Sequence, residues 1–134
     1  MAGNAQRVHD ALRDWNEGGL RALSDRWWAD DIVWHDLPDL PDPVLSRGRE
    51  EVEARIREIE LSGQFQFVVR DVEEQGDVTL AEIELVGAST QSGAEFVGRL
   101  FQASRWYDGR VVELHTFGDR PSAEAAFAAL VDAG

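Results

Sequence analysis

Asp36 is the residue of this sequence best placed for acid/base chemistry. It ends an apolar segment, residues 32–36, and prolines follow it at positions 38, 41 and 43. Proline fixes its own φ and has no amide proton, so neither a helix nor a central strand continues past this point. A carboxylate beside Trp34 at the edge of a core can have its pKa raised toward neutrality, as a general base requires. We therefore predict that Asp36 is a catalytic base; the alternative is that its carboxylate accepts hydrogen bonds from amides of the proline loop.

His115 lies on a second segment that carries ionisable residues. If residues 111–118 form a strand, alternation places on one face Val111, Glu113, His115, Phe117 and Asp119. A histidine there can polarise a carbonyl or relay a proton. The alternative is a histidine satisfied at a sheet face or a dimer interface. His9 and His35 are far from it in sequence, with no His-x-His or His-x-x-x-His spacing, so we expect no metal site.

Periodicity and turn residues predict the elements that position these groups. Apolar residues recur at helical spacing over residues 4–17, 20–28 and 48–61, and Gly18-Gly19 separates the first two helices. Residues 32–36 are predicted to form a short strand. From residue 63 the apolar period changes to two, which predicts four strands with turns at residues 75–77, 91–93 and 108–109. A terminal helix is predicted over residues 122–131.

This order predicts an α+β fold, with three N-terminal helices packed on a strongly curved, mainly antiparallel sheet and a short C-terminal helix. Five tryptophans and six phenylalanines are many for 134 residues. Packing so many rigid rings without leaving room is difficult, so we expect an apolar cavity. The residues expected to contact a bound molecule are Trp15, Trp28, Trp34, Phe67, Gln102 and Phe117.

Composition excludes several classes of function. The formal net charge of −13 repels phosphate backbones and anionic lipids, so neither nucleic acid nor a membrane is an expected partner. All 13 basic residues are arginine and there is no cysteine, which excludes lysine Schiff bases, thiolate nucleophiles and disulfides. We expect one domain, residues 1–134, that is cytoplasmic, binds a small hydrophobic molecule and uses no cofactor.

Two segments of the chain resemble a known superfamily. The first is Ala29-Asp30-Asp31, then a strand ending in His35-Asp36, a proline-containing loop, and Arg47-Gly48-Arg49-Glu50-Glu51. The second is the segment from Tyr107 to Asp119. Both are similar to the NTF2-like superfamily, which includes SnoaL-like polyketide cyclases and ketosteroid isomerases. The resemblance covers about residues 5–130 and implies a cone-shaped fold around a deep apolar cavity.

The resemblance also implies roles for particular residues. The catalytic base of ketosteroid isomerases lies at the place of Asp36, and SnoaL-like cyclases have an acid/base aspartate near the place of Asp119. The alternative for Asp119 is an N-terminal cap of the helix that begins near Pro121. The positions that match the isomerase oxyanion donors hold Ala11 and Gln102, and an alanine cannot donate a hydrogen bond. Steroid isomerisation by that route is therefore not expected.

Two functional hypotheses follow. The first is a cofactor-free isomerase, cyclase or lyase, in which Asp36 or Asp119 removes a proton from a hydrophobic carbonyl compound and His115 or Gln102 steadies the enolate. Epoxide opening would need an Asp-Arg-Asp set, of which only Arg99 and Asp119 are evident. The second is a non-catalytic module that binds a small ligand or another protein. Either would form a homodimer, since the outer sheet face would otherwise expose residues such as Phe101 and Tyr107.

Overall fold

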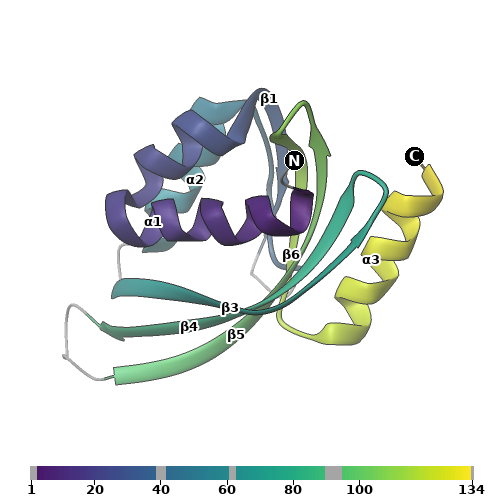
Figure 1. The fold of residues 1–134 in the computed structure, drawn as a ribbon. Helices are drawn as coiled ribbons and strands as arrows, with labels where there is room; N and C mark the ends of the chain where they lie inside the picture. The colour runs from purple at the N-terminus through teal and green to yellow at the C-terminus, as the bar shows by residue number, and fades with distance from the viewer. Residues whose placement is uncertain (1–2, 39–41, 61–62, 90–94, 134) are drawn as a thin grey trace.

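A computed structural model describes residues 3–38, 42–60, 63–89 and 95–133 of the chain (Figure 1). Its described residues form three helices and one six-stranded sheet, which confirms the predicted α+β class. In chain order the elements are α1 (Asn4–Trp27), β1 (Trp28–His35), β2 (Leu45–Arg47), α2 (Arg49–Glu60), β3 (Gly63–Gln75), β4 (Val78–Ser89), β5 (Glu95–Tyr107), β6 (Arg110–Phe117) and α3 (Arg120–Ala133).

The long first helix is bent. Gly19 has a φ of 77° and a ψ of −164°, so the two helices predicted on either side of Gly18-Gly19 are two arms of α1. A backbone conformation of this kind is essentially open only to glycine. At the start of α1, the Glu74 carboxylate accepts hydrogen bonds from the amides of Asn4 (3.3 Å) and Ala5 (2.9 Å). These two bonds satisfy amides that have no partner within the helix, and they attach α1 to β3.

The sheet has the strand order β2-β1-β6-β5-β4-β3. All neighbouring strands are antiparallel except β1 and β6, which run parallel although about 80 residues separate them. The short strand β2 was not predicted; it follows the proline loop and pairs with the end of β1. The turn predicted at residues 91–93 lies outside the described residues.

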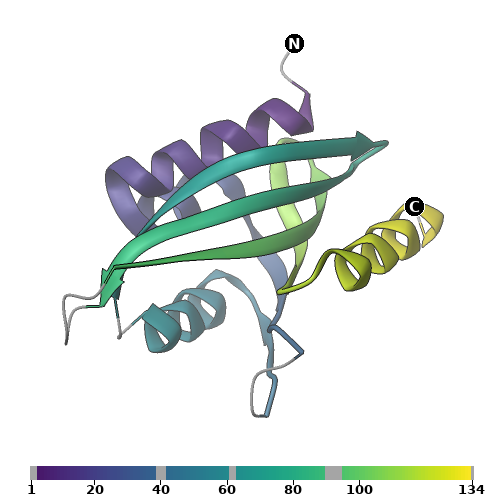
Figure 2. The same cartoon turned by 90° about the horizontal axis from the view of Figure 1, so that it is seen from below.

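The two faces of the sheet are covered by different helices. Figures 1 and 2 show α1 lying across the inner face of the curved sheet and α3 packed on the outer face. Under α3, the ring of Phe101 is buried with Phe127 and Leu130. The expectation that Phe101 is exposed is therefore wrong, because the terminal helix covers it, whereas Tyr107 is 75 % exposed. The homodimer stays a prediction.

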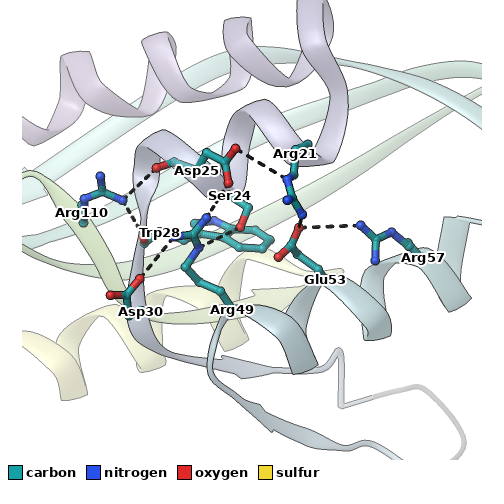
Figure 3. Close-up of polar contacts among 9 residues, drawn as sticks. All are labelled: Arg21, Ser24, Asp25, Trp28, Asp30, Arg49, Glu53, Arg57 and Arg110. Atoms are coloured by element: carbon teal, nitrogen blue, oxygen red, sulfur yellow. Dashed lines mark hydrogen bonds and ion pairs between the residues drawn. The ribbon is translucent and has the colours of Figure 1, made fainter.

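A network of arginines and acids fixes α2 against α1 and β1 (Figure 3). The guanidinium of Arg49 donates to Ser24 Oγ (3.1 Å), Asp25 Oδ1 (2.6 Å) and Asp30 Oδ1 (3.2 Å). Close by, the carboxylate of Glu53 is buried and lies 3.6 Å from an Arg21 nitrogen. The network therefore holds α2, and with it Arg55, in place against α1 and β1. None of the helices among the described residues is long and apolar enough to cross a membrane.

Candidate functional site

An apolar cavity of about 190 Å³ lies between the inner face of the sheet and helices α1 and α2. Apolar cavities of about 150 Å³ accept benzene-sized ligands, so the space is sufficient for a small organic molecule. All five tryptophans of the chain contribute to its walls. The aromatic residues that line it are Trp15, Trp27, Trp28, Trp34, Phe67 and Trp106.

A row of polar side chains crosses this otherwise apolar wall. Trp34 on β1 pairs with Leu114 on β6, and Thr116 is the next residue of β6 on the same face. Thr116 in turn pairs with Gln102 on β5, and all of these residues line the cavity. Directly opposed side chains on neighbouring strands lie about 4.5–5.5 Å apart, so Thr116 and Gln102 are neighbours, and Trp34 is diagonal to Thr116 across the β1–β6 pair.

Two atoms of this row have no hydrogen-bond partner. Within the described part of the chain, the Trp34 indole Nε1 and the Thr116 hydroxyl are both buried and unsatisfied. By contrast, the indole nitrogens of Trp27 and Trp106 donate to Asp14 Oδ2 (2.7 Å) and Thr79 Oγ1 (2.9 Å). A buried donor without a partner costs about 1–3 kcal/mol. A ligand that accepts hydrogen bonds from Trp34 and Thr116 would recover that free energy.

Asp36 lies just past the end of β1 and does not line the cavity, although Trp34 and Leu37 do. Its carboxylate accepts hydrogen bonds from Arg55 Nη2 (2.7 Å) and Nε (3.0 Å) of α2 and from the amide of Val44 (2.8 Å). Its side chain is fully buried, and that of Arg55 is 21 % exposed. The Asp36 amide also donates to the carbonyl of Val44 (3.3 Å). Asp36 therefore closes the loop between β1 and β2 and anchors it to α2.

This environment lowers the pKa of Asp36 below its ordinary value of 3.8. Burial alone raises the pKa, but the hydrogen bonds from Arg55 and Val44 and the charge of Arg55 outweigh it. The indole N–H of Trp34 acts in the same direction, although it lies outside normal hydrogen-bond geometry. The predicted rise of this pKa toward neutrality is therefore wrong. The carboxylate is held ionised in an ion pair that the sequence pattern did not reveal.

A sequence model of the SnoaL-like domain matches residues 8–114, which is more than half of the chain. The chain belongs to the SnoaL-like domain family. The family resemblance inferred from the sequence is thereby confirmed. No curated protein sequence matches this SnoaL-like domain.

Solved structures share the fold of this SnoaL-like domain at low sequence identity. IdmH from Streptomyces antibioticus, named as a candidate polyketide cyclase, is 21 % identical with a TM-score of 0.73, covering 95 % of this chain and 99 % of that one. An NTF2-like protein of unknown function from Burkholderia pseudomallei is 18 % identical with a TM-score of 0.73, and the match covers 96 % of this chain and 97 % of that one. TerC, co-crystallised with polyporic acid, is 13 % identical with a TM-score of 0.73, and the match covers 96 % of this chain and 98 % of that one. At these identities the likeness shows the NTF2-like fold alone.

Most of the residues predicted to contact a ligand line the cavity of this SnoaL-like domain. Five of the six line it, namely Trp15, Trp28, Trp34, Phe67 and Gln102. Ala11 also lines the cavity; by the resemblance to ketosteroid isomerases, it stands where they have a hydrogen-bond donor to the oxyanion. Phe117 does not line the cavity, because it lies on the outer face with the Phe101 and Phe127 cluster under α3. Its predicted contact with a ligand in this cavity is therefore not supported.

Asp119 does not line the cavity. Its carboxylate accepts a hydrogen bond from the amide of Ser122 (2.9 Å) in the first turn of α3. This bond lowers the pKa of the Asp119 carboxyl below its ordinary value. The geometry is that of an N-terminal helix cap, the alternative considered from the sequence. Arg99 likewise faces outward, 3.3 Å from Glu82 Oε2, so the structure offers no Arg99–Asp119 set in the cavity for epoxide opening.

His115 also lies on the outer face of the sheet. Its ring stacks on that of His35, with centroids 3.7 Å apart, and its Nε2 lies 2.6 Å from Glu113 Oε2. Burial and the neighbouring His115 charge lower the pKa of His35 below 6.5, although Glu113 opposes this shift. His115 therefore does not reach a ligand in the cavity. The prediction that it stabilises an enolate there is not supported.

The sequence analysis missed three residues that the structure makes prominent. They are Thr116 in the cavity, Arg55 as the partner of Asp36, and Glu113 between the two histidines. For Thr116 a signal existed, since Leu114 and Thr116 form the less polar face of their strand. Arg55 was one of many charged residues, and no local pattern distinguished it. Alternation did place Glu113 on the face of His115, but its contact with His35 depends on the pairing of β1 with β6.

Proposed function

We propose that this SnoaL-like domain binds a small, neutral, mostly apolar molecule that presents one hydrogen-bond-accepting oxygen to Trp34 and Thr116. The observation that carries the proposal is that Trp34 and Thr116, which both line the apolar cavity, each have a buried polar atom without a hydrogen-bond partner. Few, well-placed polar groups in an apolar pocket are the usual way in which a protein orients a small ligand. The residues that line the cavity include no ionisable side chain, so a neutral ligand fits better than a charged one.

A carbonyl compound satisfies this description best. A carbonyl oxygen has two lone pairs, so it can accept from the Trp34 N–H and the Thr116 O–H together. The remaining walls would contact an aromatic or aliphatic body. Two donors on one carbonyl oxygen also polarise it, which is the electrostatic part of enolate chemistry. The names of the fold neighbours agree with a small organic ligand, since TerC was crystallised with polyporic acid and IdmH is named as a candidate polyketide cyclase.

The test uses acetophenone and its hydrocarbon analogue ethylbenzene as probes, with binding measured by isothermal titration calorimetry. Thr116→Val keeps the shape of the side chain and removes its hydroxyl. We expect this variant to bind acetophenone about fivefold more weakly, which corresponds to the loss of about 1 kcal/mol for one hydrogen bond. Its affinity for ethylbenzene should be unchanged or improved, because a hydrocarbon leaves the hydroxyl unsatisfied. Equal effects on both probes, or no binding of either, would contradict the proposal.

A second candidate function is proton removal from the bound carbonyl compound by Asp36, as in an isomerase or cyclase. One observation favours it: Asp36 is a buried, ionised carboxylate directly before Leu37 and two residues after Trp34, both of which line the cavity. Against it, the carboxylate is bound to Arg55 and Val44 and its pKa is lowered, which makes it a weaker base. Reaction would require a carboxylate oxygen to leave this arrangement.

Deuterium exchange at the methyl group of acetophenone, followed by proton NMR in D₂O, tests the second candidate. If Asp36 is the base, the domain accelerates exchange, and Asp36→Asn returns the rate to that of buffer. Arg55→Met is the matched control, because it breaks the same ion pair but keeps the carboxylate, and it should retain the acceleration. If wild type gives no acceleration, or if both variants lose it equally, Asp36 is not the base.

A further inference from the structure

Two strands that are distant in sequence bring three metal-ligating side chains together on the outer sheet face. The parallel pairing of β1 with β6 places His35 directly opposite His115. Glu113 lies two residues before His115 and therefore on the same face of β6. This face is opposite to the one that lines the cavity, so the cluster is separate from the candidate site described above.

The side chains of this cluster converge on one point. Nε2 of His115 lies 2.6 Å from Glu113 Oε2, and Nε2 of His35 lies 3.5 Å from the same oxygen. One ligand atom from each of the three residues lies within 4.8 Å of the others. The side chains are 20–35 % exposed, so an ion from solvent can reach them while the strands hold their Cα positions.

We propose that His35, Glu113 and His115 form a binding site for a divalent transition-metal ion, of which Zn²⁺ suits the ligands best. Two imidazole nitrogens and one carboxylate oxygen are a ligand set that Zn²⁺ takes at about 2.0–2.2 Å, with the fourth position open to water or another ligand. Harder ions such as Mg²⁺ and Ca²⁺ prefer oxygen ligands alone.

Binding requires a small rearrangement of the side chains. A metal ion lies in the plane of each imidazole that it binds, and the two rings are now stacked with only 10° between their planes. The rings must therefore tilt apart, and the 2.6 Å contact between His115 and Glu113 must open to admit the ion. Rotation about side-chain bonds supplies both movements, because the backbone positions are already adjacent through the strand pairing.

Charges around the cluster both favour and oppose a cation. The chain has a formal net charge of −13, which raises the local concentration of cations at its surface. Arg47 on β2 acts against binding, since its charge reaches His35. Arg105, opposite Glu113 on β5, is bound to Asp77 at 3.1 Å and so is partly neutralised. Arg47→Gln should accordingly strengthen metal binding rather than weaken it.

Titration of the tag-free protein with ZnCl₂, followed by calorimetry, tests the proposal. We expect one ion per chain in wild type, and at least about tenfold weaker binding in His35→Ala, His115→Ala and Glu113→Gln. His9→Ala is the matched control: it removes an exposed histidine of α1 and should keep wild-type affinity. With Co²⁺ in place of Zn²⁺, wild type should show visible absorption bands distinct from those of the aquo ion.

Thermal unfolding provides a second, independent measurement of binding to the folded state. ZnCl₂ should raise the melting temperature of wild type and of His9→Ala, because the ion binds the folded state, and should not raise that of His115→Ala. Glu113→Gln, which is nearly isosteric, serves if the alanine variants do not fold, as judged by far-UV circular dichroism. Absence of binding in wild type overturns the proposal, as does unchanged affinity when His35, His115 or Glu113 is replaced.

Discussion

Asp36→Ala is expected to lower the free energy of unfolding by about 3–5 kcal/mol, the range for removing one partner of a buried ion pair. The variant leaves the guanidinium of Arg55, whose side chain is only 21 % exposed, without its carboxylate partner. It also leaves the Val44 amide without its acceptor and so loosens the loop between β1 and β2. Urea denaturation monitored by far-UV circular dichroism measures the change.

Asp30→Ala is the matched control for this prediction. Asp30 also pairs with an arginine, at 3.2 Å from Arg49, but its side chain is 96 % exposed. Exposed ion pairs contribute about 0–1 kcal/mol, so this variant should stay close to wild type. Adding Arg55→Met to Asp36→Ala should restore part of the lost stability, since it removes the uncompensated charge. If Asp36→Ala costs no more than Asp30→Ala, the ion pair is not the structural element described above.

Ala81→Phe should abolish binding of acetophenone, with a loss of affinity of at least about 100-fold. Ala81 lies on β4, pairs with Gln102 on β5, and lines the cavity beside the polar row. A phenyl group at this position extends into the space that a ligand would occupy. Filling a cavity restores packing contacts, so the stability of the variant should fall by no more than the 1–3 kcal/mol typical of overpacking. Calorimetry gives the affinity and urea denaturation gives the stability.

The matched control places the same substitution on the surface. Ala125 is an exposed residue of α3, on the opposite side of the sheet from the cavity, and Ala125→Phe should bind acetophenone as wild type does. Retained binding in Ala81→Phe would show that acetophenone binds elsewhere. That result would also remove the structural basis of the proposed function, because the polar row and Ala81 share one wall.

Local sequence patterns predicted most of the secondary structure. Glycine at positions 18 and 19 marked the bend in α1, and Asp108-Gly109 marked the last hairpin, where both residues have positive φ. The aromatic residues predicted to surround a cavity do so, apart from Phe117. These features depend on spacing and on conformational preferences that a short window of sequence contains.

The features that the sequence did not predict depend on pairing across the chain. Alternation along β6 put Val111 on the face of His115, but the register shifts opposite Arg105 and Trp106, and Val111 lines the cavity. The lowered pKa of Asp36 depends on Arg55, which lies 19 residues away on α2. The contact of His35 with His115 depends on the parallel pairing of β1, the first strand of the chain, with β6, the last strand, which no local period encodes.

The placement of all five tryptophans around one cavity has a practical consequence. Indole emission is sensitive to the polarity of its surroundings and is quenched by nearby carbonyl groups. A compound that enters the cavity therefore changes the intrinsic fluorescence of every emitting indole in the molecule, with no background from indoles elsewhere on the surface. Unlabelled compound collections can be screened on the unmodified chain by this signal alone.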